Sequence, residues 1–395
     1  MIDLNLMGRL VQALADDARL IVLGDADQLP SVDAGAVLRD LVDADERARG
    51  EQVQQLALQG VSTPDEVARS AAEMRVVRLT HSYRMSPKDP LGRAILTVTR
   101  LVNAGEPSQL FDHEIEGRIV LTQRQHASEL TFAGVEWVPS GAKEKATLLE
   151  KWLAEKITGH REYEALSSRV YRRGPDGFRP DDAEALERLT KHLASARILC
   201  ATRVFSGGAD TINHLMHGRM LLHKGRTTDP GLIAGEPVLV ERNDYDRKLF
   251  NGDQGVVVMA ADGDAPAELT VVFKRDQRFD AFRLAGMQQD LSLAYAMTVH
   301  KAQGSEFDDV VFVLPDQDMP ILTRELLYTA MTRSRRSVTL MGSRELLEEM
   351  VRRKMSRFSG LADGIERNLA SIGVAPTPTP APVAVTARRP RTRRR

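Results

Sequence analysis

The stretch YAMTVHKAQGSEFDDVVFVLP, residues 295–315, decides the fold. Its second part, Val310 to Leu314, is an apolar run of the kind that forms a strand buried on both faces of a parallel sheet. The part before it, near residues 292–303, is predicted to be a helix. Packing does not require so many Thr, His, Lys, Gln, Gly, Ser and Glu residues between a helix and a strand. The stretch therefore predicts a ligand site within an α/β fold.

Outward from this stretch, the same plan of strand, loop and helix repeats along the chain. Four further apolar runs are predicted as strands: Ala18 to Leu23, Val76 to Leu79, Arg197 to Ala201 and Ser337 to Met341. Helical patterns cover residues 6–17, 40–73, 143–156, 181–194 and 324–333, and a helix carrying Asn213 follows the loop 206–208. Strand signals near 118–122 are mixed. Alternation of this kind predicts a mostly parallel sheet with helices packed on it.

Residues 232–285 have a different character. Short apolar runs, such as Pro237 to Val240 and Leu269 to Phe273, are separated by Asn-Asp, Asn-Gly-Asp and Asp-Gly turns. This pattern predicts a small all-β insert with the form of a barrel. After about residue 372 the chain is rich in proline and arginine, which cannot bury a core, and it is predicted to be disordered.

The composition excludes several classes of protein. The 395 residues carry a formal net charge of -1, so nucleic-acid binding has to come from local basic strips rather than from the whole surface. A single cysteine, Cys200, cannot form a disulfide framework or a cysteine metal cluster. The sequence has no membrane-spanning stretch or signal peptide, so a cytoplasmic protein is predicted.

Two further segments carry residues suited to phosphate chemistry. In GDADQLPSV, residues 24–32, the amide of Gln28 can bond a phosphate oxygen or orient water, although an Asp-rich turn is an equally good explanation. In LTHSYRM, residues 79–85, Tyr83 can stack on a base and Arg84 can neutralise a phosphate. Tyrosine beside arginine is also common on ordinary surfaces, and this explanation is favoured for the segment taken alone.

The 295–315 stretch and the helix after it offer more specific chemistry. Gly304 permits close approach of a phosphate, and Glu306 can accept a ribose hydroxyl. Thr298, His300 and Lys301 can meet a DNA backbone. The helix near 324–333 ends in arginines that can cap it or, in the case of one arginine, reach a γ-phosphate across a cleft.

In order and spacing, these segments resemble motifs III to VI of superfamily 1 helicases. The wording LGDADQLPSVDAGAVL, LTHSYRM, FNGDQG, YAMTVHKAQGSEFD and RELLYTAMTRSRR is most similar to the RecD family, the alpha subunits of exonuclease V in superfamily 1B. The resemblance implies RecA-like lobes, the first one incomplete, with an SH3-like insert that includes Arg242 to Tyr245 and Leu249 to Asp253. The implied division is 1–85 for the first lobe, 86–231 with 286–350 for the second, 232–285 for the insert, 351–371 for a helix and 372–395 for the tail.

The resemblance also implies roles for particular residues. Gln28 senses the γ-phosphate, and Arg84 and Arg333 touch it. Residues on the nucleotide side are Asp25, Tyr83, Gly304 and Glu306. Residues on the side of the DNA are Thr298, His300, Lys301 and Asn213. No metal ligand is assigned.

The implied activity is ATP-driven 5′ to 3′ DNA unwinding in double-strand-break repair, with RecB-like and RecC-like partners, single- or double-stranded DNA, ATP and Mg²⁺. The chain departs from the family by having no Gly-rich phosphate loop and no acidic pair after an apolar strand. Gly141-Ala142-Lys143 has the wrong spacing, and Asp65-Glu66 follows a proline rather than a strand. We expect an N-terminally truncated chain that is inactive alone. A truncated gene model, a separately encoded N-terminal half and a relic are equally open explanations.

Two alternatives stay open at this point. The chain can be a fragment of a stand-alone RecD-like helicase. It can also be a non-catalytic DNA-binding or assembly module that uses its β insert and its arginine tail, in which case its DNA binding is salt-sensitive and independent of sequence.

Overall fold

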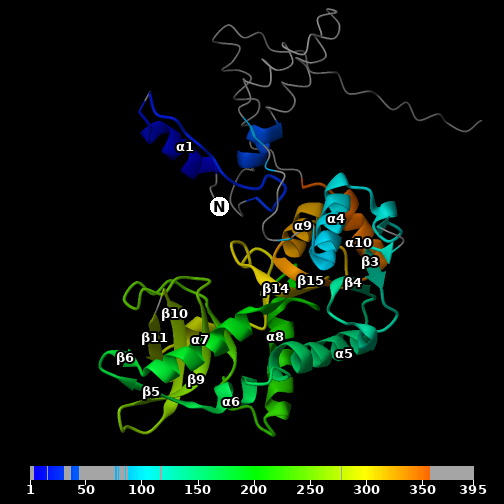
Figure 1. Cartoon of the computed structure of the whole chain (residues 1–395). Coiled ribbons are helices and arrows are strands. Elements are labelled where there is room, and N and C mark those ends of the chain that lie inside the picture. Colours follow the sequence, from blue (N-terminus) through cyan, green and yellow to red (C-terminus); the bar gives the residue numbers. More distant parts are fainter. Residues whose placement is uncertain are drawn as a thin grey trace, which may run out of the picture. The chain divides into compact units, whose positions relative to one another are not determined.

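The computed structural model describes residues 4–15, 17–30, 37–43, 76–77, 79, 85, 88–115, 118–276 and 278–355 (Figure 1). The chain divides into two compact units. The first comprises Met1–Ala26, Pro30–Arg78 and Arg357–Arg395, and the second comprises Asp27–Leu29 and Leu79–Ser356. Tyr83, Arg84, most of the predicted helix 40–73 and the predicted disordered tail lie outside the described residues.

The first unit contains helix α1, Leu4–Ala13, and a helical segment at 37–43. The predicted strand Ala18 to Leu23 is not a strand, and the side chains of Ile21 and Leu23 are 81% and 87% exposed. An apolar run becomes a strand only when a neighbouring strand supplies hydrogen-bond partners, and no strand lies among the residues of this unit that the structure describes. Val76, Val77 and Leu79 also lie outside any strand, which corrects the second prediction of this kind.

A six-stranded sheet forms the centre of the second unit, in the order β13-β7-β14-β15-β4-β3. Every neighbouring pair in it is parallel. Its strands are β3 Leu121–Gln123, β4 Gly134–Val138, β7 Ala196–Cys200, β13 Ala296–Thr298, β14 Phe307–Val313 and β15 Ser334–Met341. The four residues from Val310 to Val313 are fully buried, so the predicted α/β class and the predicted central strand are confirmed.

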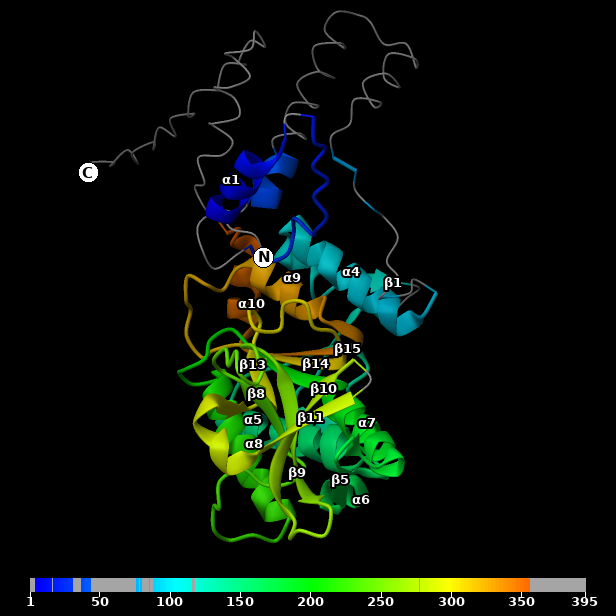
Figure 2. The ribbon, with the colours of Figure 1, turned by 90° about the vertical axis from the view of Figure 1, so that its left-hand side faces the viewer.

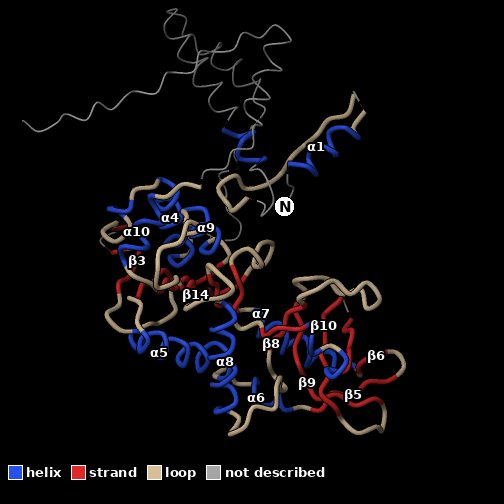
Figure 3. The backbone as a smooth tube through the Cα atoms, turned by 180° about the vertical axis from the view of Figure 1, so that it is seen from behind, coloured by secondary structure: helices blue, strands red, loops and turns tan. Residues whose placement is uncertain are grey.

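Helices cover both faces of this sheet (Figures 1 and 3). They are α4 Pro90–Ala104, α5 Ala142–Trp152, α6 Tyr163–Ser168, α7 Pro180–Ala194, α8 Ala209–His223, α9 Arg324–Met331 and α10 Arg344–Arg352. Successive side chains of a strand point to opposite faces. Accordingly, Val310 and Phe312 pack in one core with α4, α9 and α10, whereas Val311 and Val313 pack in another with α5, α7 and α8. Within the described ranges, no helix combines the length and the apolar character needed to cross a membrane.

Short elements connect these helices and strands. They are the hairpin strands β1 Glu114–Ile115 and β2 Arg118–Ile119, a π-helix at Leu153–Thr158, and single turns of 3₁₀-helix at Pro107–Gln109, Ala127–Glu129, Leu284–Gly286 and Gln288–Asp290.

A second sheet of seven strands contains the predicted β insert. Its strands are β5 Val170–Gly174, β6 Gly177–Phe178, β8 Pro237–Val240, β9 Gln254–Asp262, β10 Glu268–Arg275, β11 Arg278–Arg283 and β12 Leu291–Leu293. Figure 2 shows β9, β10 and β11 running side by side. The all-β character of 232–285 is confirmed, but the sheet also includes β5, β6 and β12 from outside these residues. The SH3-like assignment stays a prediction.

The predicted helix at 292–303 is wrong. This segment contains β12 and β13, and only hydrogen-bonded turns follow from Val299 to Gly304. The apolar run from 293 to 297 suits a buried helix and a buried strand equally, and its parallel pairing with β7, Ala296 opposite Ile198, selects the strand. Thr298 consequently lies at the carboxyl end of a strand.

Candidate functional site

The segment Gln28–Leu29 is the point where three of the sequence motifs meet. The buried Leu29 donates its backbone N–H to Oγ1 of Thr329, 2.8 Å away. Its carbonyl oxygen accepts a hydrogen bond from Nε2 of Gln303 at 2.9 Å. Arg333 donates to Oε1 of Gln28 at 2.7 Å. The motifs around residues 28, 303 and 333 therefore form one site. The order of the motifs in the sequence does not reveal this contact.

Arg333 is held rigidly at this site. Its side chain is buried, with 3% of the residue exposed. Nε donates to the carbonyl oxygen of Thr329 and Nη1 to that of Ser305, each at 3.3 Å. A guanidinium fixed by backbone carbonyls keeps its charge and its planar set of donors in one orientation. The arrangement suits recognition of a phosphate next to the Gln28 amide.

Gly304 and Glu306 lie on the same segment as Ser305. Gly304 has a φ of +83°, a conformation that L side chains rarely adopt, and a Cβ there would meet open space. The position therefore needs glycine for its backbone conformation. Glu306 accepts hydrogen bonds from Nε and Nη2 of Arg335, at 3.1 and 2.6 Å. A ribose hydroxyl at Glu306 would have to share this carboxylate with Arg335.

The sheet places the two groups of predicted residues at opposite strand ends. Glu306 immediately precedes β14 and Arg333 immediately precedes β15, whereas Thr298 is the last residue of β13. Because all strands of this sheet are parallel, Glu306 and Arg333 lie at its amino edge and Thr298 lies at its carboxyl edge. One short segment thus links both edges. Asp25 is exposed and belongs to the other unit.

Lys301 is paired with a carboxylate that the sequence analysis did not identify. Its Nζ donates to both oxygens of Glu241, at 2.9 and 2.8 Å. Arg203, which follows β7, donates to the same carboxylate at 3.3 Å, and Oγ of Ser292 donates at 2.6 Å. Burial raises the pKa of Glu241, but hydrogen bonds from Lys301 and Ser292 and the charges of Lys301 and Arg203 outweigh it and hold the pKa below the ordinary value. Glu241 therefore occupies, as an anion, the place between two cations that a phosphate could take.

The neighbours of Lys301 complete this group. Oγ1 of Thr298 accepts a hydrogen bond from the backbone N–H of Lys301 at 3.3 Å. His300 is partly buried, and its carbonyl oxygen accepts from the N–H of Gln303 at 3.2 Å. The three residues that the sequence assigned to DNA are thus neighbours on one turn.

Asn213 has a different place. Its side chain is buried, with 7% of the residue exposed. Nδ2 donates to the carbonyl oxygens of Leu293 and Ala296, at 2.8 and 2.9 Å, and Oδ1 accepts from the N–H of Ala296 at 2.7 Å. Both amide protons are used to hold strand β13, so the prediction that Asn213 contacts DNA finds no support in this geometry. Asn213 positions the strand that ends in Thr298.

Several residues of the site escaped the sequence analysis. Gln303 and Thr329 lie inside motifs that were quoted, but no role was assigned to their side chains. Glu241 and Arg203 carried no local signal, because their significance depends on the strands that bring them together. Within the described ranges, no group of three or more His, Cys, Asp or Glu side chains is placed to hold a metal ion.

Two family models match the chain. Residues 293–341 match the UvrD-like helicase C-terminal domain, and residues 1–60 match an AAA domain. The solved structures that match the chain include Pif1 helicases at forked double-stranded DNA, at 18% identity, covering 62% of this chain and 56% of that one, with a TM-score of 0.27.

Similarity to RecD proteins extends over most of the chain. The RecBCD enzyme subunit RecD of Mycolicibacterium smegmatis is 31% identical over 374 residues, which is 95% of this chain and 53% of that protein. The corresponding subunit of Haemophilus influenzae is 27% identical, over 93% and 53%. The ATP-dependent RecD2 DNA helicase of Deinococcus radiodurans is 28% identical, over 84% and 33%. The chain spans about half the length of the curated RecD subunits it matches. The chain is therefore similar to RecD subunits along most of its own length.

Proposed function

We propose that the chain forms part of the motor of an ATP-dependent, 5′ to 3′ DNA helicase of the RecBCD type. In this proposal it acts in the cytoplasm on broken double-stranded DNA, together with RecB-like and RecC-like subunits. The observation that carries the proposal is the hydrogen bond between Arg333 and Gln28, at 2.7 Å.

This pair suits the terminal phosphate of a nucleotide. The guanidinium supplies positive charge, and the amide can turn to donate its own N–H groups to a phosphate oxygen or to a water molecule. An arginine held close to a γ-phosphate stabilises the charge that develops during phosphoryl transfer. Gly304 leaves room beside this pair, and Glu306 offers an acceptor for a hydroxyl.

Lys301 and Arg203 suit the backbone of a DNA strand. Both cations already hold an anion, Glu241, between them. A DNA phosphate has the same charge and accepts the same hydrogen bonds. Thr298, at the end of β13, adds a hydroxyl on the same turn.

We further propose that this chain supplies only the terminal-phosphate side of the ATP site. The 395 residues contain no Gly-x-x-x-x-Gly-Lys-Ser/Thr loop to cradle phosphates and no acidic pair after an apolar strand to bind Mg²⁺. The residues of this chain would hold the terminal phosphate, while a phosphate loop and carboxylates that bind Mg²⁺ would come from residues outside these 395.

The test compares the chain alone with a reconstituted motor. The portion of the Mycolicibacterium smegmatis RecD that this chain does not match would be supplied as a second polypeptide. DNA-stimulated ATP hydrolysis and unwinding of duplexes with 5′ or 3′ single-stranded tails would then be measured. We expect no hydrolysis by the chain alone, and hydrolysis with unwinding of the 5′-tailed duplex by the pair.

Two results would contradict the proposal. Hydrolysis by the chain alone, abolished by Arg333→Ala, would show that no second polypeptide is needed. DNA binding without hydrolysis in the reconstituted pair would favour a non-catalytic binding or assembly module instead.

A further inference from the structure

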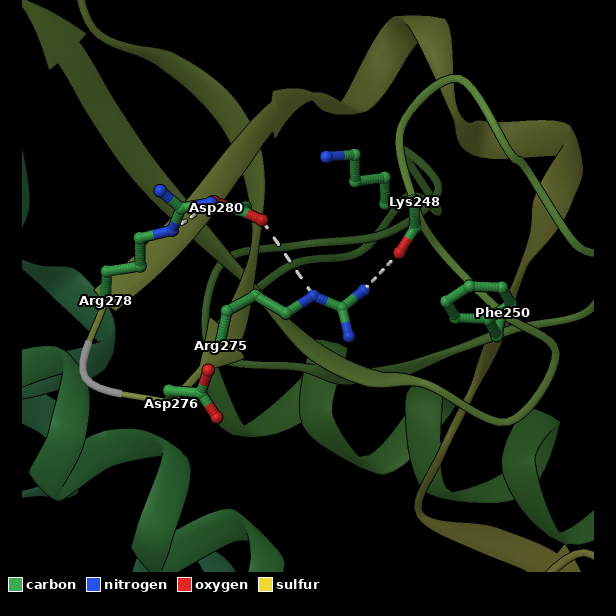
Figure 4. A pocket seen from close by; sticks show the side chains of 6 residues that line it. All are labelled: Lys248, Phe250, Arg275, Asp276, Arg278 and Asp280. Atoms are coloured by element: carbon green, nitrogen blue, oxygen red, sulfur yellow. Dashed lines mark hydrogen bonds and ion pairs between the residues drawn. The ribbon is translucent and has the colours of Figure 1, made fainter.

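The second sheet and the segment 241–253 border a cavity of about 570 Å³ that is separate from the proposed motor site (Figure 4). Its volume lies within the range of roughly 300–1,000 Å³ that is usual for ligand sites. The lining residues are Lys248, Phe250, Arg275, Asp276, Arg278 and Asp280. They come from the ends of β10 and β11 and from the segment 241–253, which connects β8 with β9.

The wall of the cavity is built by Arg275. Its Nη2 donates to the carbonyl oxygen of Lys248 at 2.8 Å and to Oδ2 of Asp253 at 2.7 Å. Asp253 in turn accepts from the N–H of Phe250 at 2.8 Å. Nε of Arg275 also pairs with Oδ2 of Asp280, 3.8 Å away (Figure 4). Arg275 therefore fixes the 241–253 segment against the ends of β10 and β11 and shapes the cavity.

The groups that stay available are an aromatic ring and an amine. Phe250 is 48% exposed, and its ring meets that of Tyr245, itself 75% exposed, edge to face with centroids 6.4 Å apart. No described residue accepts a hydrogen bond or forms an ion pair with Nζ of Lys248. An exposed ring beside a free cation is the combination with which proteins bind single-stranded nucleic acid, because bases stack on the ring and phosphates meet the cation.

The same segment connects this cavity with the motor site. It begins at Glu241, whose carboxylate holds Lys301 and Arg203, and it passes Tyr245, Lys248 and Phe250 before it returns at Asp253. A strand whose phosphate displaced Glu241 would thus lie against the base of the segment that carries the cavity. This continuity favours nucleic acid over an acidic peptide, because the DNA strand that we propose at Lys301 would continue along the segment to the cavity.

We propose that the cavity at Phe250 binds one nucleotide of a single DNA strand, with the base stacked on Phe250 and the adjacent phosphate on Lys248. This site deepens the proposed function and rests on it, because the strand is the one that Lys301 contacts. Asp276 and Asp280 also line the cavity, and their negative charges disfavour a second phosphate.

The test measures binding of the full chain to fluorescently labelled (dT)20 by anisotropy. We expect Phe250→Ala to weaken binding roughly 5- to 150-fold, the effect of losing one stacked base, and Phe250→Tyr to restore it. Lys248→Ala should lower the slope of log affinity against log salt by about 0.7, the effect of one phosphate contact on a single strand. Leu222→Ala and Lys191→Ala, exposed residues of α8 and α7, serve as matched controls and should change neither quantity.

A second readout locates the base directly. Light-induced cross-linking of an oligonucleotide that contains 5-iodouracil should label Phe250 or Tyr245, identified by mass spectrometry. Labelling only outside residues 241–253 would overturn the cavity proposal.

The outcomes separate this proposal from the function on which it rests. If Lys301→Ala weakens binding and Phe250→Ala does not, the cavity proposal is wrong and the proposed function stands. If the unaltered chain does not bind (dT)20 at low salt, both fail. If an acidic peptide occupies the cavity and leaves DNA binding unchanged, the occupant is a protein and the proposal is overturned.

Discussion

Arg333 and Gln28 are 305 residues apart in the sequence, yet the guanidinium of one donates to the amide oxygen of the other at 2.7 Å. The contact joins the motif at residues 24–32 to the end of the motif at residues 324–333. The contact brings together two of the groups that we propose to meet the terminal phosphate.

Arg333→Ala should reduce ATP hydrolysis by the reconstituted motor about 10³-fold or more, because an arginine at the γ-phosphate contributes this much to phosphoryl transfer. Binding of (dT)20 should change by less than about twofold, since Arg333 lies at the opposite edge of the sheet from Thr298. Arg336→Ala, an exposed arginine three residues away, is the matched control. Equal losses of hydrolysis in both variants would show that general positive charge, and not this contact, matters.

Glu241→Gln should strengthen binding of (dT)20 roughly 3- to 10-fold, because the substitution removes an anion that competes with the DNA phosphate for Lys301 and Arg203. The affinity should also depend more steeply on salt concentration. Without the carboxylate of Glu241, Lys301 and Arg203 pair with ions from solution, and DNA displaces these ions when it binds. Titrations of labelled (dT)20 at several salt concentrations give both quantities. Glu348→Gln, which removes a carboxylate paired with Arg344 and Arg352 on α10, should have no effect. Weaker binding by Glu241→Gln would mean that Glu241 orders the site and does not compete with phosphate.

Asn213→Ala should lower the free energy of unfolding by about 2 to 4 kcal/mol, because it leaves three buried backbone groups without a partner. Urea unfolding monitored by tryptophan fluorescence measures this. His214→Ala, an exposed neighbour on the same helix, should cost less than about 0.5 kcal/mol. If Asn213→Ala instead left stability unchanged and weakened DNA binding, the DNA contact implied by the resemblance would be correct.

His217 links helix α8 to the segment before strand β8 through two carboxylates. Its Nδ1 lies 2.7 Å from Oε1 of the buried Glu236, and its Nε2 lies 3.2 Å from Oδ1 of Asp229. The hydroxyl of Tyr295 also donates to Glu236, at 3.2 Å. The hydrogen bond with Glu236 is the main cause that raises the pKa of His217 to about 9, against the opposing effect of burial.

Stability should therefore depend on pH through His217. The pKa of the folded state lies above the unfolded value of about 6.5, so the protonated side chain stabilises the fold fully below that pH. The contribution is lost as the pH rises through about 9. Urea unfolding of the unaltered chain between pH 6 and 9.5 should show this loss, and His217→Gln should flatten it. Parallel pH profiles for both proteins would rule out His217 as the titrating group.

The sequence predicted the centre of the molecule well. Strands β7, β14 and β15 each contain an apolar run, because both faces of a parallel sheet are covered. The segment 292–303 was mistaken for a helix because its apolar residues fit both periodicities, and only the pairing of Ala296 with Ile198 decides between them. The strand predicted from Ala18 to Leu23 was wrong for a related reason, because a strand requires a neighbouring strand and the side chain of Ile21 is exposed.

The site was predictable in part. Gln28 and Arg333 stood out through their motifs, but their contact depends on the fold as a whole. Glu241 could not be foreseen, since a glutamate after a strand is common, and its partner Lys301 is 60 residues away in the sequence. The DNA contact of Asn213 stays a prediction from the resemblance, because nothing in a single sequence distinguishes an amide that binds a ligand from one that holds a buried strand.

The separation of Gln28 from Arg333 also fixes an order of assembly during translation. At about 5–20 residues per second, a ribosome needs roughly 15 to 60 s to add the 305 residues between them. Leu29, which is buried in the finished protein, lacks its partners Gln303 and Thr329 until 274 and 300 further residues have been added. The segment around Leu29 is therefore open to chaperones and proteases until synthesis is almost complete, and its burial marks the moment at which the motor site closes.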